Sequence, residues 1–230
     1  MFFGFDNGFT LLLVFIGMGL SMAASAFVTS TFRKYDRVSS RNQVTGTDAA
    51  QYILRDQNVH NVGVQEIAGD LTDNYNSGTK ILSLSQATAQ STSVAAVGVA
   101  AHECGHAVQD AVGYTPLRIR AALVPAANIG STISIPLILI GLVLHGSFLV
   151  NLGILAFSMA FLFQLVTLPV EFNASRRALA ILDEGGLLTK EEMPMARKVL
   201  IAAALTYVAA AITTLLQLIR LIMIANNRRE

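Results

Sequence analysis

The chain has few charged residues, one cysteine and no tryptophan. Only 13% of its 230 residues are charged and 53% are hydrophobic, which lies outside the usual range of soluble globular domains. The single cysteine, Cys104, excludes an intramolecular disulfide. The sequence also lacks repeats, low-complexity segments and any cluster of basic and aromatic residues, so we expect no nucleic-acid partner. These features favour a protein of the membrane.

Long hydrophobic runs are the main feature that the sequence does have. A helix needs about 20 apolar residues to cross the roughly 30 Å hydrocarbon core of a bilayer. Four stretches meet this requirement: residues 9–28, 121–144, 148–168 and 200–225. The first resembles a signal peptide, but no Lys or Arg precedes it, so we expect a retained anchor. The sequence therefore predicts a predominantly α-helical integral membrane protein with four transmembrane helices in a lipid bilayer.

Basic residues predict how these spans are oriented. Of the 16 Lys and Arg residues, 8 lie within residues 33–120 and 5 within residues 176–198, and four spans place both segments on the same side. Segments rich in Lys and Arg favour the cytoplasm. The chain is therefore predicted to be a multi-pass protein of the cell membrane with both segments cytoplasmic, although Arg228 and Arg229 argue weakly against this orientation.

The pentapeptide His102-Glu103-Cys104-Gly105-His106 is the clearest chemical pattern. Residues four apart share one face of a helix, so both histidines can bind one metal ion while Glu103 lies beside a bound water. Cys104 should point away from the histidines, and we interpret it as structural. The pattern predicts a zinc hydrolase with one Zn²⁺ per chain and Glu103 as the general base.

The residues around this motif favour a helix over 93–112. Ser91, Thr92 and Ser93 are candidates for the N-cap, and no proline follows before residue 116. Gly113 suits the position after the last helical residue. Short motifs of this kind also occur by chance in proteins without metal, so the helical context and the membrane spans strengthen the interpretation.

The motif lies in residues 29–120, which we expect to form a small α+β metalloprotease domain. Within it the sequence predicts a helix over 47–55 capped by Thr47 or Asp48, strands over 59–67 and 80–85, and a loop over 73–78. An exposed edge strand beside the zinc helix would hold a peptide substrate by strand addition. The alternative is a covered or fully paired strand. The candidate residues for this edge are Lys80, Ile81, Leu82, Ser83 and Leu84.

Two histidines leave a catalytic zinc short of one protein ligand. His145 follows the second span, across the bilayer from the motif, and His60 is a lone histidine in the right domain. Asp183 lies in a segment that faintly resembles the Leu-Asp-Gly element of intramembrane site-two proteases, but it more simply ends a helix. Glu171 follows the third span, and Pro169 before it suits the first turn of a new helix within residues 169–199.

Two segments together resemble a known family. Residues 100–107 (AAHECGHA) and 168–178 (LPVEFNASRRA), joined by two spans, are similar to the YugP-type bacterial membrane zinc metallopeptidases over nearly the whole chain. The layout also resembles the HtpX-type membrane proteases. The resemblance implies a zincin-like fold, peptidase activity, zinc ligation by His102, His106 and Glu171, and Glu103 as the catalytic carboxylate.

The segment around Glu171 also supplies candidates for supporting roles. HtpX-type proteins carry a Glu and an Asp near the third ligand, where this chain has Asn173 and Ser175. The residues that hydrogen-bond to the zinc ligands are therefore expected to differ here. Arg176 and Arg177 are candidates for orienting Glu171 or for polarising the scissile carbonyl, and Asn173 is a third candidate. Tyr114 and His60 are alternative donors to the carbonyl oxygen, and the arginines equally suit lipid headgroups.

A zinc peptidase near the bilayer should act on peptide or protein substrates, with membrane proteins among them, and a regulatory membrane partner would fit such a site. Two other functional classes compete. A noncatalytic scaffold or regulator of a partner protein would use the zinc as a structural clip. A transporter would use the polar residues Gln164, Gln217 and Arg220 in the spans, but the chain shows no repeated broken helices.

Overall fold

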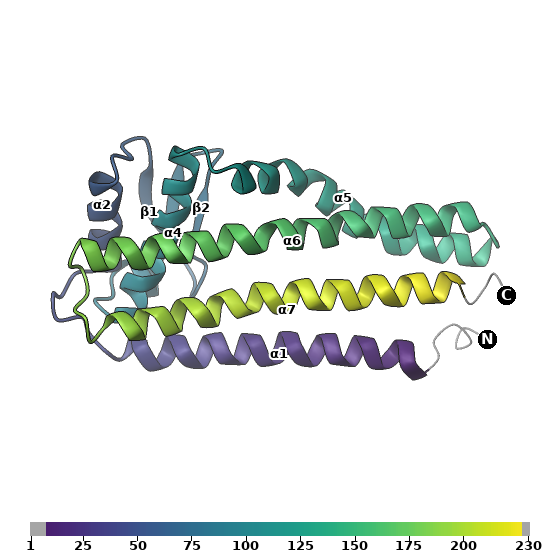
Figure 1. Cartoon of the computed structure of the whole chain (residues 1–230), viewed down its shortest axis with the longest axis horizontal. Helices are drawn as coiled ribbons and strands as arrows, with labels where there is room; N and C mark the ends of the chain where they lie inside the picture. Colours follow the sequence, from purple (N-terminus) through teal and green to yellow (C-terminus); the bar gives the residue numbers. More distant parts are fainter. Residues whose placement is uncertain (1–7, 227–230) are drawn as a thin grey trace. The chain divides into compact units, whose positions relative to one another are not determined.

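The computed structural model describes residues 8–226, which are mostly helical with one small sheet. In chain order the elements are α1 (Gly8–Asp36), α2 (Gly46–Asp56), β1 (Gly63–Ile67), β2 (Asn74–Asn76), β3 (Ile81–Ser85), α3 (Gln86–Ala89), α4 (Val94–Ala111), α5 (Thr115–Val143), α6 (Ser147–Glu184) and α7 (Met193–Asn226) (Figure 1). Two compact units divide the described residues. The first comprises 8–25, 118–168 and 206–226, and the second comprises 26–117 and 169–205.

Four helices, α1, α5, α6 and α7, are long and apolar enough to cross a membrane, as judged by length and composition. This confirms the prediction of a mostly helical protein with four such helices and a small sheet. Each helix extends beyond its apolar run, and α6 is the longest with 38 residues. The hydrophobic runs predicted which part of each helix can cross a bilayer. The helices are longer than these runs because helical hydrogen bonding continues into the polar residues beside them.

The structure corrects the prediction that a new helix begins after Pro169. Residues 147–184 form one helix, and Pro169 lies inside it. Proline removes one backbone hydrogen bond within a helix, a loss that neighbouring groups in membrane helices can offset. Glu171 is therefore carried by the same helix as the apolar residues before it.

Small residues let the helices of the first unit approach closely. A Cβ atom added at Gly130 of α5 would lie 2.3 Å from the carbonyl oxygen of Ala156 on α6. Between α1 and α7, the Thr213 hydroxyl donates a hydrogen bond to the carbonyl oxygen of Gly17 at 3.0 Å. Close backbone approach and hydroxyl hydrogen bonds are typical of helix interfaces inside membranes.

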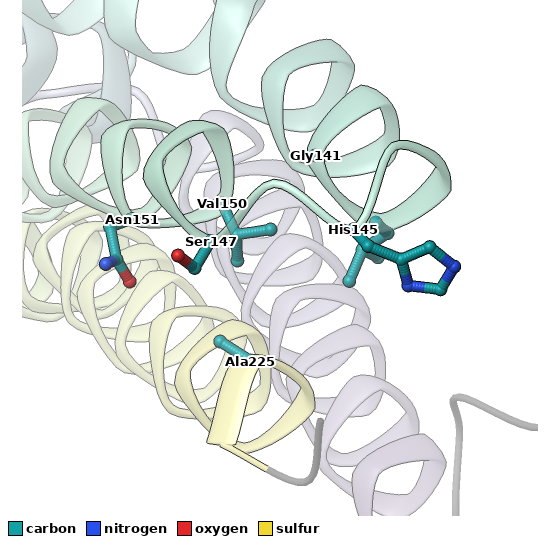
Figure 2. A pocket seen from close by; sticks show the side chains of 7 residues that line it. Gly141, His145, Ser147, Val150, Asn151 and Ala225 are labelled. Atoms are coloured by element: carbon teal, nitrogen blue, oxygen red, sulfur yellow. The ribbon is translucent and has the colours of Figure 1, made fainter. Parts of the chain in front are cut away.

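A pocket lies beside the turn between α5 and α6 in the first unit (Figure 2). His145 lies in this turn with a backbone φ of 55°, and its side chain is exposed. The remaining lining residues are Gly141, Leu142, Ser147, Val150, Asn151 and Ala225. The pocket is thus formed by the ends of three helices and the turn that joins two of them.

The sheet of the second unit has the strand order β1-β3-β2. Strand β3 pairs in parallel with β1 and antiparallel with β2, so it is the central strand. Its side chains Leu82 and Leu84, which share one face of the sheet, are fully buried. Of the two alternatives for this segment, the structure therefore shows the paired strand and not the open edge: Ile81, Leu82, Ser83 and Leu84 lie in β3, and Lys80 directly precedes it.

Three further details of this unit differ from the sequence-based expectations. Strand β1 is shorter than the predicted 59–67, and β2 lies inside the segment predicted as a loop. Helix α2 begins one residue earlier and is capped by Thr45, not by Thr47 or Asp48. The Thr45 hydroxyl accepts from the backbone of Asp48, whose carboxylate in turn accepts from the backbone of Thr45. A reciprocal capping box therefore starts the helix.

Helix α4 lies in the core of the second unit. Ser93 caps its first turn by accepting a hydrogen bond from the backbone N–H of Ala96 at 3.1 Å. The helix ends at Ala111, and Gly113 follows at a φ of 65°, the left-handed conformation that glycine adopts without a steric cost. Nearly every residue of α4 is buried, so its polar side chains are placed by close packing on all faces.

Candidate metal centre

Helix α4 presents two imidazoles on one face. His102 and His106 lie one helical turn apart, and both are buried, with 9% and 7% of their surface exposed. Their rings meet edge to face, with centroids 4.8 Å apart and planes at 85°. The spacing of the motif thus produces the arrangement that the sequence predicts for two ligands of one ion.

A glycine between these residues allows α6 to approach α4. A Cβ atom added at Gly105 would lie 2.6 Å from the carbonyl oxygen of Ala174, closer than real Cβ contacts allow. Ala174 is one helical turn from Glu171, which is 2% exposed. The close approach therefore brings a third buried polar side chain toward the histidines.

The donor atoms of these three side chains converge. The Nε2 atom of His102 is 3.2 Å from Oε2 of Glu171, and the Nε2 atom of His106 is 3.6 Å from the same oxygen. Two ligands at about 2.0–2.1 Å from a tetrahedral zinc lie about 3.3 Å apart. Candidate ligand atoms of all three residues lie within 4.8 Å of one another. The two histidines and one carboxylate therefore fit a zinc ion.

Both histidines have polar partners at their other ring nitrogen. Nδ1 of His102 is 3.1 Å from the hydroxyl of Ser175, and Nδ1 of His106 is 3.1 Å from Oε1 of Gln109. Histidine ligands of metals almost always use the second nitrogen in this way, which orients the ring and supports ligation through the first. The two Nδ1 contacts leave Nε2 of each ring on the side of Glu171.

Glu103 is buried beside the cluster, with 8% of its surface exposed. Burial raises the pKa of its carboxyl group, and the nearby His102 and His106 oppose this rise. Within residues 8–226, the carboxylate makes no hydrogen bond or ion pair with another residue. A buried carboxylate without such a partner has its oxygens available for water or substrate.

Cys104 lies on the opposite side of the helix from this chemistry. Its thiol contacts the carbonyl oxygen of Ala50 at 3.7 Å, and the residue is fully buried. Burial also raises the pKa of the thiol, so it stays protonated and unreactive at neutral pH. The geometry agrees with the interpretation of Cys104 as a structural residue.

The other ligands considered from the sequence do not join the cluster. His60, His145 and Asp183 are all exposed, and the metal-binding group found among the described residues contains none of them. Arg176 is exposed too, whereas Arg177 is half-buried and donates from Nε to Oδ1 of Asn173 at 2.9 Å.

Two residues close to the ligands were given no role from the sequence: Gln109 was not considered, and Ser175 was noted only as a difference from HtpX-type proteins. Gln109 lies three residues after His106, and Ser175 lies four residues after Glu171. Both spacings place a side chain on the same helical face as a ligand, and that periodicity was the available signal. What the sequence could not show is that α4 and α6 pack face to face.

A second contact ties strand β2 to the end of α4. The Tyr75 hydroxyl donates a hydrogen bond to Oδ2 of Asp110 at 2.6 Å, and Lys80 forms an ion pair with the same oxygen. Burial and the Asp110 carboxylate together raise the pKa of Tyr75, so its hydroxyl remains a donor. Of the two edge strands, β2 is therefore the one that is fastened to α4.

Comparison with known proteins identifies the family. The family model described as "Putative neutral zinc metallopeptidase" matches residues 10–226. The chain is 42% identical over 219 residues to the "Putative membrane protease YugP" of Bacillus subtilis (strain 168). This alignment covers 95% of the chain and 97% of the relative. No solved structure matches the chain. With this match and the buried His-His-Glu cluster, the chain belongs to this family of zinc metallopeptidases of the membrane.

Proposed function

We propose that this protein is a membrane-embedded endopeptidase in which His102, His106 and Glu171 hold one zinc ion. The observation that carries the proposal is the convergence of these three buried side chains: Oε2 of Glu171 lies 3.2 Å from Nε2 of His102 and 3.6 Å from Nε2 of His106. The family adds that the substrates are peptides or proteins.

Glu103 is the proposed general base. Zinc, when bound, polarises a carbonyl group and lowers the pKa of water to about 7. Glu103 accepts a proton from the attacking water at its carboxylate and passes it to the departing amine nitrogen. Its lack of a hydrogen-bonding partner among residues 8–226 supports this role, because no other side chain competes for its oxygens.

An extended substrate would have to pair with an edge of the sheet. Strand β3 is paired on both sides, so β1 and β2 are the edges. Because Tyr75 of β2 donates a hydrogen bond to Asp110 at the end of α4, we place the substrate backbone along β2, next to the helix that carries the motif.

The bilayer and the charge pattern suggest where the enzyme acts. Segments 33–120 and 176–198 carry most of the basic residues, which supports a cytoplasmic catalytic unit on a protein with four spans. A catalytic unit continuous with membrane helices favours cytoplasmic segments of membrane proteins as substrates, and it leaves room for a regulatory membrane partner.

Zinc content tests the ligand set. We expect about one zinc per chain in the detergent-purified protein and in Asp183→Ala, a matched control that removes an exposed carboxylate of α6. Glu171→Ala should lose the metal because it removes one of three protein ligands. Absence of zinc from the native chain after metal supplementation, or its retention in Glu171→Ala, would contradict the proposed site.

A further inference from the structure

A chain of hydrogen bonds leads from His106 to the half-buried guanidinium of Arg177. An arginine Nε–H can only donate, so the Asn173 atom that lies 2.9 Å from it acts as the acceptor, as expected of the amide oxygen Oδ1. That oxygen accepts a second bond from Nε2 of Gln109 at 3.0 Å. Arg177 therefore determines which way the Asn173 amide points.

Gln109 is the next link. Its Nε2 also donates to the backbone carbonyl oxygen of Val170 at 2.8 Å, and a carbonyl oxygen can only accept. Two acceptors at this end of the side chain place the amide nitrogen there. Because Gln109 is fully buried, water cannot replace either bond at low cost. Its Oε1 is consequently held 3.1 Å from Nδ1 of His106.

The direction of these bonds selects one tautomer of His106. An amide oxygen has no proton to give, so Nδ1 of His106 must carry the hydrogen in their contact. In a neutral imidazole the other nitrogen, Nε2, then keeps its lone pair. That nitrogen faces Glu171 at 3.6 Å, on the side where the candidate ligand atoms converge.

We propose that Arg177, Asn173 and Gln109 form a hydrogen-bond relay that holds His106 in the tautomer able to bind zinc, with Arg177 as the outermost positioning residue. This inference rests on the proposed zinc site and deepens it. Loss of Asn173 or Arg177 leaves the Gln109 amide held only by the Val170 carbonyl, and loss of Gln109 removes the acceptor at Nδ1. Each change raises the population of the tautomer that cannot ligate through Nε2.

Zinc affinity, measured by competition with a chromophoric chelator, tests the relay in the full-length protein in detergent. Gln109→Met should weaken binding by about 10- to 100-fold, the usual effect of removing a partner of a histidine ligand. Asn173→Leu, one link further from His106, should weaken binding by a smaller factor. Asn173→Asp should bind at least as tightly as the native chain, because its carboxylate accepts both bonds. Arg197→Met, which removes an exposed arginine of the same unit, should bind zinc like the native chain.

Coupling between the links separates the relay from a merely structural role. Arg177→Met should weaken zinc binding in the native background and add nothing to Gln109→Met. Nitrogen-15 spectra of histidine-labelled, metal-free protein, recorded at a pH where the imidazole is neutral, should show the hydrogen of His106 on Nδ1 in the native chain and a mixture of tautomers in Gln109→Met. The relay would be overturned if the single variants bound zinc like the native chain, if the losses from Arg177→Met and Gln109→Met were additive, or if the tautomer were unchanged in Gln109→Met. Absence of zinc from the native chain would instead contradict the proposed site, while the spectra would still decide the tautomer.

Discussion

Two buried glutamates of the centre differ in their partners. Glu171 lies 3.2 Å and 3.6 Å from two imidazole nitrogens, whereas Glu103 makes no hydrogen bond or ion pair within residues 8–226. A carboxylate placed among ligand nitrogens suits a metal ligand. A buried carboxylate without a partner suits a base, because burial raises its pKa toward the pH at which it must exchange protons.

This contrast predicts the effect of replacing Glu103 with glutamine. Glu103→Gln should keep its zinc, because the three ligands are unchanged, and should cleave peptides at least about 100-fold more slowly, since an amide cannot accept the proton. Cleavage is measured by mass spectrometry on a mixed peptide library. Glu184→Gln, at an exposed position of α6, is the control expected to keep native activity. Native-like cleavage by Glu103→Gln would contradict its role as the base.

At the scale of the elements, the site depends on how closely α4 and α6 approach. Gly105→Ala would force a Cβ atom to within 2.6 Å of the Ala174 carbonyl oxygen. We expect a net destabilisation of about 1–3 kcal/mol from overpacking, together with weaker zinc binding as Glu171 moves away. Thermal unfolding and the chelator competition described above measure the two effects.

Gly98 provides a matched control on the same helix. A Cβ atom added there would lie 3.6 Å from the Cβ of Ala196, an ordinary van der Waals contact. Gly98→Ala should therefore stabilise the protein by up to about 1 kcal/mol through helix propensity and leave zinc binding unchanged. Equal behaviour of the two alanine variants would contradict the importance of close packing at Gly105.

At the scale of the whole molecule, the four spans and the distribution of Lys and Arg predict which segments face the cytoplasm. Labelling with a membrane-impermeant maleimide in intact cells tests this orientation, because the buried native Cys104 should not react. We expect His145→Cys, in the exposed turn between α5 and α6, to react from outside. Asp56→Cys, at the exposed end of α2, should react only after permeabilisation. The reverse pattern would place the zinc centre outside the cytoplasm.

Much of this protein follows from local sequence signals. Hydrophobic runs long enough for a bilayer predicted four candidate spans, and the four-residue spacing of His102 and His106 predicted one shared helical face. The resemblance to a family pointed to Glu171 as a neighbour of both histidines. These conclusions could be reached because each depends on composition, on helical periodicity or on short motifs.

Other features were decided only by the tertiary structure. Strand β3 is a central strand because β2 forms within a segment that reads as a loop, and pairing between strands cannot be seen in either strand alone. Glu171 meets the histidines because α6 continues through Pro169 and packs on Gly105. The contacts of Gln109 and Ser175 with the two imidazoles likewise depend on side-chain directions across a helix interface. The sequence thus determined which residues share a helical face, whereas long-range packing decided which faces meet.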